Sequence, residues 1–244
     1  MLKQSGANER NFVPGPLDYF LWSLTAICEV SVLVCAFARK SLRRYLSLNL
    51  YMLASLLVTI FRYWTFSHYG FASSQYCYFY YYSEALLTIG LYFGLITLYS
   101  HVLNELQAGQ YVSTVATLLL AGTALFSYLV VQQASDRMMT RFVVELSQNL
   151  YFVGLVLTYL LWGAILKLRE TRTRVVHLVL SLGVYFSAFA ANYALRNLYP
   201  SLHSVLSYVP PLIGLCLPLA WAYAFWRVPE EARLTPSRLA VVPR

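Results

Sequence analysis

The chain has 244 residues, of which 59% are hydrophobic and 11% charged, and its mean hydropathy is +0.57. An ordinary soluble domain carries about 25% charged residues. This composition excludes a soluble enzyme, a disordered protein and a nucleic-acid-binding domain, because too few polar side chains are present to cover a globule. The net charge of +8 therefore needs an explanation other than a nucleic-acid partner.

Seven apolar runs are long enough to cross a bilayer, which takes about 20 residues in a helix. They cover residues 17–38, 45–67, 78–103, 111–133, 142–166, 175–198 and 204–226. Residues 1–16 lack the layout of a signal peptide, so we expect the first run to remain as a span. The sequence predicts an all-α membrane protein with one seven-helix domain over 17–226. Short tails flank it at 1–16 and 227–244.

The positions of lysine and arginine predict the orientation. Loops and tails on one side of the predicted bilayer hold twelve of the 18 basic residues, and the other side holds six. Because the cytoplasmic side carries the excess, we expect the N-terminus outside and the C-terminus inside a bacterial inner membrane. The same asymmetry accounts for the net charge without nucleic acid, and the bilayer is the first predicted partner. The twelve are Arg39, Lys40, Arg43, Arg44, Lys167, Arg169, Arg172, Arg174, Arg227, Arg233, Arg238 and Arg244.

A weak internal symmetry is compatible with this layout. The first three and last three spans both start outside, and a basic loop follows the first span of each set. Arg62 and Arg196 occupy similar positions near the outer ends of the second and sixth spans. One interpretation is a three-plus-one-plus-three parallel repeat, with the fourth span as connector. The alternative is that the charge rule alone produces the alternation.

Ionisable side chains inside the spans are the most informative feature, because they are expensive in a bilayer and usually face the bundle interior. Each shares a helical face with other polar residues, spaced three or four positions apart. The candidate ligand-binding or proton-handling residues are Glu29, Arg62, Glu84, Glu145, Asn149, Asn192 and Arg196.

Two interpretations of these residues stay open. Either they line a polar cavity that faces outward, or Arg62 pairs with Glu84 and Glu145 with Arg196 to hold helices together. Glu29 lies deepest, and two arginines cannot neutralise three glutamates. It is therefore a candidate proton relay, with a neutral, hydrogen-bonded glutamate as the alternative.

The last span contains Pro210, Pro211 and Pro218, which predict either a hinge or a static kink. No catalytic motif stands out in the sequence, so an enzyme is the least favoured class, and we expect no cofactor or metal. A retinal Schiff base would need a lysine inside a span. The four histidines lie near headgroup level, too shallow for a buried haem.

The seven-span layout and the tyrosine-rich start of the third span, Tyr76 to Glu84, resemble uncharacterised seven-helix inner-membrane proteins of bacteria. The resemblance implies a multi-pass membrane protein. The function expected is binding or transport of a small ligand in an outward-facing cavity. A receptor-like sensor, or a non-catalytic protein that acts through a membrane protein partner, is the alternative.

Overall fold

The computed structural model is helical throughout the part of the chain that it describes, with no strand there. The described residues are 16–70, 73–103, 109–132, 138–168, 173–199, 203–206 and 208–229, so most of both predicted tails lies outside them. The helices are α1 (Pro16–Ala38), α2 (Leu46–Tyr69), α3 (Ser74–Leu103), α4 (Gly109–Gln132), α5 (Met138–Leu168), α6 (Thr173–Leu198), α7 (His203–Leu206) and α8 (Val209–Arg227).

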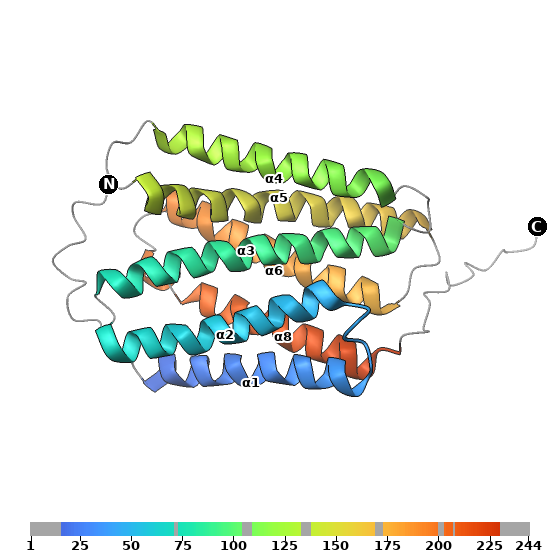
Figure 1. Cartoon of the computed structure of the whole chain (residues 1–244), viewed down its shortest axis with the longest axis horizontal. Helices are drawn as coiled ribbons and strands as arrows, with labels where there is room; N and C mark the ends of the chain where they lie inside the picture. Colours follow the sequence, from blue (N-terminus) through green and yellow to red (C-terminus); the bar gives the residue numbers. More distant parts are fainter. Residues whose placement is uncertain are drawn as a thin grey trace, which may run out of the picture.

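Seven of these helices, all except α7, are long and apolar enough to cross a membrane. Their bounds confirm the seven predicted spans, with differences of only a few residues at most ends. The fold is therefore that of a multi-pass membrane protein. The helices run roughly antiparallel in one bundle (Figure 1), as short connections require.

Six helices form a closed ring. In order around it, α1 packs against α2, α2 against α3, α3 against α5, α5 against α6, α6 against α8, and α8 against α1. α4 stands outside the ring and packs on α5 and, less extensively, on α3 (Figure 1). The ring thus joins the first three helices to the last three, with the fourth at its periphery. This arrangement is compatible with the three-plus-one-plus-three repeat, which stays a prediction.

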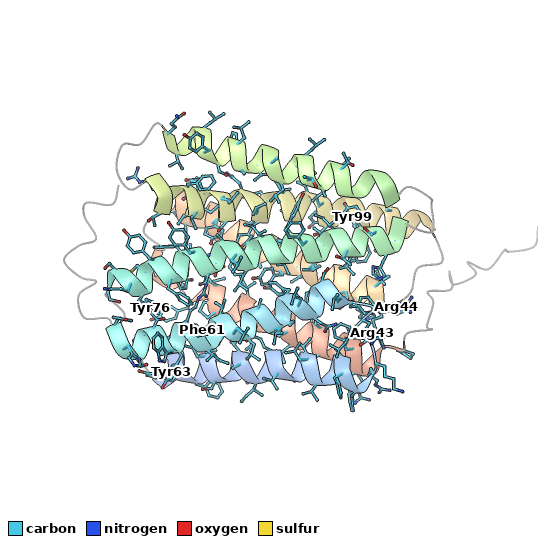
Figure 2. The ribbon with its side chains drawn as sticks, viewed as in Figure 1. Arg43, Arg44, Phe61, Tyr63, Tyr76 and Tyr99 are labelled. Carbon is cyan, nitrogen blue, oxygen red and sulfur yellow. The ribbon has the colours of Figure 1, made fainter. Side chains whose placement is uncertain are left out.

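The two ends of the bundle differ in composition. We call them the Pro16 end, where α1 begins, and the Ala38 end, where it finishes. Figure 2 shows Phe61, Tyr63 and Tyr76 toward the Pro16 end, with Arg43 and Arg44 at the Ala38 end. The orientation of the chain in the bilayer was predicted from this excess of basic residues at one end of the apolar spans.

The last span begins later than expected. Instead of one helix over 204–226, the structure has the short α7 and then α8, which begins at Val209 and has prolines in its first turn. A proline has no backbone N–H to donate, and it disfavours helical geometry in the residue before it. Pro210 and Pro211 are therefore tolerated at a helix start, where N–H groups have no partner within the helix. Pro218 alone lies inside α8.

The half of the ring toward the Ala38 end is filled with apolar side chains. Leu48, Leu95, Leu98, Trp221 and Phe225 are all but completely buried there and belong to one core cluster. The Trp221 indole N–H donates to the Ser181 hydroxyl at 2.8 Å, so the one polar atom of this side chain is satisfied. This packing closes the ring axis at one end.

Candidate functional site

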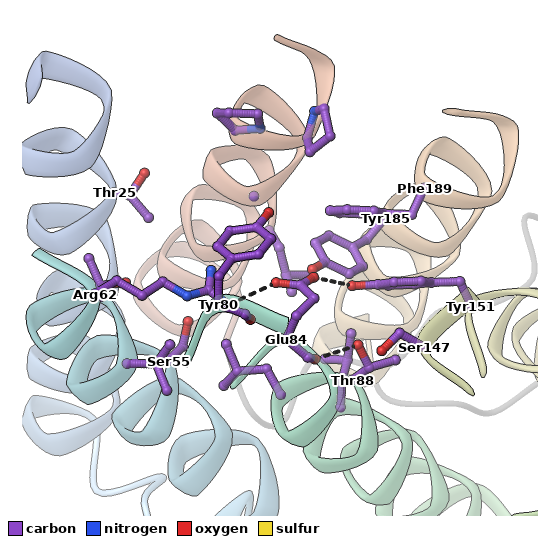
Figure 3. A pocket seen from close by; sticks show the side chains of 18 of the residues that line it. Thr25, Ser55, Arg62, Tyr80, Glu84, Thr88, Ser147, Tyr151, Tyr185 and Phe189 are labelled. Carbon is purple, nitrogen blue, oxygen red and sulfur yellow. Dashed lines mark hydrogen bonds and ion pairs between the residues drawn. The ribbon is translucent and has the colours of Figure 1, made fainter. Parts of the chain in front are cut away.

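A cavity of about 730 Å³ occupies the other half of the ring, toward the Pro16 end. All six ring helices contribute to its lining, whereas no described residue of α4 does. Its volume is within the range of small-molecule sites, roughly 300–1,000 Å³. The lining combines aromatic, hydroxyl and charged side chains (Figure 3), a composition foreign to a bundle packed only for stability.

A charged network crosses this cavity between α2, α3 and α5. Arg62 Nη2 lies 3.1 Å from Glu84 Oε2, and Tyr151 donates its hydroxyl to Glu84 Oε1 at 2.8 Å. Arg62 also donates to the Ser83 hydroxyl and, at 3.2 Å, to the Tyr80 carbonyl. Figure 3 shows Glu84 held between Arg62 on one side and Tyr151 on the other. Both charges of the pair are thus matched, as a low-dielectric site requires.

Glu29 lies on α1 in the same cavity lining and is 3% exposed. Ser55 on α2 donates its hydroxyl to Glu29 Oε1. The second oxygen, Oε2, is buried without a hydrogen-bond partner among the described residues. A buried carboxylate without a counter-charge is strongly disfavoured, so this group is completed either by a proton or by a ligand.

Arg196 is the second incompletely satisfied charge in the lining. Its Nη2 donates to the Leu206 carbonyl of α7 at 3.1 Å, whereas its Nε is buried and has no partner among the described residues. Arg196 lies seven residues beyond Phe189 on α6, about 10 Å further toward the Pro16 end at 1.5 Å per residue. It therefore stands near the mouth of the cavity, beside exposed Asn197.

Aromatic side chains form much of the wall. Tyr151 stacks on Phe189 with 4.6 Å between ring centroids, and Tyr185 lies 4.7 Å from the same ring. The Arg62 guanidinium carbon lies 4.4 Å from the centroid of the Tyr80 ring. The remaining aromatic lining residues are Trp22, Tyr51, Tyr81 and Tyr193.

The cavity ends blindly near the middle of the bundle. Met52, Leu91 and Leu217 line its floor and are almost completely buried. Below them lies the apolar core with Trp221, whose ring centroid is 6.0 Å from that of Tyr51. The access is therefore from the Pro16 end, where Tyr80 and Tyr81 are more than one-third exposed.

The structure brings together four of the seven sequence candidates. Glu29, Arg62, Glu84 and Arg196 line one cavity, although they lie on four different helices. Arg62 and Glu84 form the expected ion pair. Glu145 does not line the cavity, and the described residues contain no ion pair between it and Arg196. The expectation that these two would face one another is therefore wrong.

Two amides also lie elsewhere. Asn149 faces α4, where it donates to the Ser127 hydroxyl at 3.0 Å, so it joins the peripheral helix to the ring. Asn192 is 2% exposed, and neither its amide oxygen nor its nitrogen has a partner among the described residues. It is buried in α6 away from the cavity lining.

The α5 wall is the part that the sequence interpretation predicted least well. The sequence predicts a polar stripe of Glu145, Gln148, Asn149 and Tyr159 on this helix, and of these Gln148 alone lines the cavity. The residues of α5 in the cavity lining are Val144, Ser147, Gln148 and Tyr151. Their spacing of three, four and seven residues marks one helical face. Tyr159 is 65% exposed and points away from the bundle. The spacing of these four residues, from Val144 to Tyr151, is the feature of the sequence that could have identified the correct face.

Seven membrane-length helices, six of which surround a one-ended polar cavity, define a multi-pass membrane protein. The described residues contain no cluster of histidine, cysteine, aspartate or glutamate that could hold a metal ion. Comparisons with protein families, with curated proteins and with solved structures found no significant match to this chain. Any statement about function therefore depends on the cavity itself.

Proposed function

We propose that this protein binds a small polar ligand in the ring cavity and transports it across a bacterial inner membrane. The observation that carries the proposal is a cavity of about 730 Å³ whose lining contains two incompletely satisfied charged groups, Glu29 Oε2 and Arg196 Nε. Buried polar groups are usually paired. Asn192 also has unpaired amide atoms, but it lies away from the cavity lining, whereas Glu29 and Arg196 belong to it. Empty space beside unpaired polar atoms is typical of a binding site.

The orientation predicted from the basic residues makes the cavity outward-facing. The Ala38 end carries Arg39, Lys40, Arg43 and Arg44 and is closed by the packed core. Transport by alternating access requires that this closed end opens when the other closes. The ring offers a division for such a movement, because it consists of two sets of three helices that are consecutive around it, α1 to α3 and α5, α6 and α8.

A receptor-like sensor is the second candidate, because a blind cavity that opens to one side also suits detection of an external ligand. Such a sensor would signal through a partner in the membrane, and α4 offers a helix outside the ring for that contact. Arg39 and Arg174 tie the Ala38 end to the last turn of α8 through the carbonyls of Trp226 and Val228. These contacts would have to break in a transporter and can persist in a sensor.

A stability screen tests whether the cavity binds a ligand. Small polar compounds are added to the purified protein, because a ligand that binds only the folded state raises its thermal midpoint. The matched control is Gly214→Leu. Gly214 lies on the cavity face of α8 between Pro210 and Leu217, and a Cβ added there meets nothing within 4 Å.

A compound that stabilises the wild type but not Gly214→Leu binds the cavity. Uptake of that compound by proteoliposomes then separates transport from sensing. If every stabilising compound acts equally on both proteins, the proposed function is wrong.

A further inference from the structure

We propose that the ligand of this cavity is a small organic cation whose ammonium group binds Glu29. This inference rests on the proposed function and adds the chemical class of the substrate. Glu29 is the buried acid of the lining that lacks a counter-ion, and it lies near the closed end, where a bound molecule would be held.

Neither arginine in the cavity lining forms an ion pair with Glu29. Arg62, one turn beyond Thr59 on α2, directs its donors to Glu84, Ser83 and the Tyr80 carbonyl. Arg196 lies near the mouth and makes no ion pair with any described residue. Lysine side chains are absent from the described cavity lining. Arg62 is close enough to interact with Glu29 electrostatically but is bonded to Glu84, so a positive charge in direct contact with Glu29 has to come from outside the described residues.

The free atom has the chemistry of an acceptor. Glu29 Oε1 accepts from Ser55, whereas Oε2 is buried without a hydrogen-bond partner among the described residues, on a side chain that lines the cavity. An ionised carboxylate can only accept hydrogen bonds. A primary or secondary ammonium donates N–H groups to it and supplies the missing charge at once. An anionic ligand would instead place two like charges together in a low-dielectric site.

The aromatic wall favours the same class. Tyrosine and tryptophan rings attract cations to their faces. The cavity already demonstrates this contact within the chain, since the Arg62 guanidinium lies over Tyr80 at 4.4 Å. Trp22, Tyr51, Tyr151, Tyr185 and Tyr193 line the same cavity as Glu29. Aromatic rings and a carboxylate in one cavity suit an ammonium ligand.

The size of the space distinguishes an organic cation from a metal ion. A bare ion needs several converging oxygen or nitrogen ligands within about 2.0–2.6 Å. The described residues hold no group of three or more histidine, cysteine, aspartate or glutamate side chains that could bind a metal ion. A cavity of about 730 Å³ instead leaves room for carbon atoms against the aromatic wall.

The experiment measures binding of two cations and their uncharged and anionic analogues to the purified full-length protein by calorimetry at millimolar concentration. The cations are n-butylammonium, which has N–H donors, and choline, which has none. Three analogues serve as controls. They are n-butanol, butyrate, and the neutral isostere of choline in which a carbon atom replaces the nitrogen. We expect at least one cation to bind about tenfold or more tightly than its neutral analogue, the ratio that corresponds to one good charged contact.

Two variants locate the effect. Glu29→Gln keeps the shape of the side chain and the bond from Ser55 but removes the charge, so the preference for cations should disappear. Glu145→Gln makes the same chemical change in a partly buried glutamate outside the cavity lining, and it should bind like the wild type. Circular dichroism and the thermal midpoint show that both variants fold. Equal loss in both variants, or an undiminished preference in Glu29→Gln, would overturn the assignment.

The remaining outcomes separate the substrate class from the proposed function. If n-butanol or butyrate binds as well as the cations, and Gly214→Leu abolishes that binding, the cavity binds ligands but the cation assignment is wrong. If no compound of this set binds the wild type, the cation assignment is also wrong, and the proposed function then depends on the stability screen alone. Failure of both experiments would refute both proposals.

Discussion

The two halves of the ring are built from the same six helices and differ in what those helices direct at the ring axis. Toward the Ala38 end the axis is filled by leucine, valine, phenylalanine and Trp221, and those side chains are almost completely buried. Toward the Pro16 end the same helices direct tyrosine, hydroxyl and charged side chains inward and leave a cavity. Both halves are apolar on the outside, because both face lipid. The two halves therefore differ in the side chains that the helices direct at the ring axis. Mean hydropathy does not distinguish the packed half from the half with the cavity.

The largest expected effect is the loss of a buried side chain from the packed half. Trp221→Ala should destabilise the protein by about 3–5 kcal/mol, because it leaves a large void in a closed core. Trp22→Ala removes the same side chain from the cavity half, where it is only partly buried and already borders empty space. We expect a clearly smaller loss there. Unfolding in a denaturing detergent measures both free energies, and equal losses would mean that the two halves are packed alike.

A pair of glycines gives effects of opposite sign. A Cβ added to Gly154 would lie 2.5 Å from Phe186 Cε1, in a ring that is 1% exposed, so Gly154→Ala should cost about 1–3 kcal/mol through overpacking. Gly214→Ala meets nothing within 4 Å and replaces the poorer helix former, so it should be neutral or stabilising by up to about 1 kcal/mol. The thermal midpoints of both variants check this. A stable Gly154→Ala protein would contradict the close contact of α5 with α6.

Accessibility to water should follow the same division. Thr25 lines the cavity, and Val32 lies seven residues further along α1 on the same face but is 0% exposed. In a chain whose four native cysteines are replaced by alanine, Thr25→Cys should react with a membrane-impermeant thiol reagent and Val32→Cys should not. In intact cells the reaction should occur from outside. Labelling of Thr25→Cys only after the cells are opened would reverse the predicted orientation.

The pH dependence of cation binding sharpens the role of Glu29. A proton and an organic cation compete for one carboxylate, so the affinity for n-butylammonium should fall as the pH is lowered. The charged or titratable groups near Glu29 are Cys28 on its own helix, Tyr51 and Arg62 on α2, and Glu84 on α3. The described lining residues of α8 are uncharged. Glu29→Gln should bind weakly and without this slope. A slope that persists in this variant would contradict competition between the proton and the cation at Glu29.

Much of this arrangement could be predicted from the sequence, and the failures have physical causes. The spans followed from hydropathy, and the partnership of Arg62 with Glu84 followed from the cost of burying either charge alone. The face of α5 was misjudged because a polar side chain in a membrane helix can satisfy itself on any neighbour, and Asn149 does so on Ser127 of α4. Periodicity shows that a stripe exists but not which helix it meets. The order of helices around the ring is likewise a property of tertiary packing alone.

The smallest expected effect concerns the ion pair at the boundary between cavity and water. Arg62 and Glu84 are 17% and 19% exposed, and each keeps other partners when the opposite residue is replaced: Arg62 keeps Ser83 and the Tyr80 carbonyl, and Glu84 keeps Tyr151. Polar contacts between membrane helices contribute about 0.6 kcal/mol on average and rarely exceed 1.7 kcal/mol. A double-mutant cycle with Arg62→Gln and Glu84→Gln should therefore give a coupling energy within that range. A coupling of several kcal/mol would show that the ion pair is a principal structural contact of the ring. The cavity half would then be stabilised by charge, as the packed half is stabilised by Trp221 and the leucines around it.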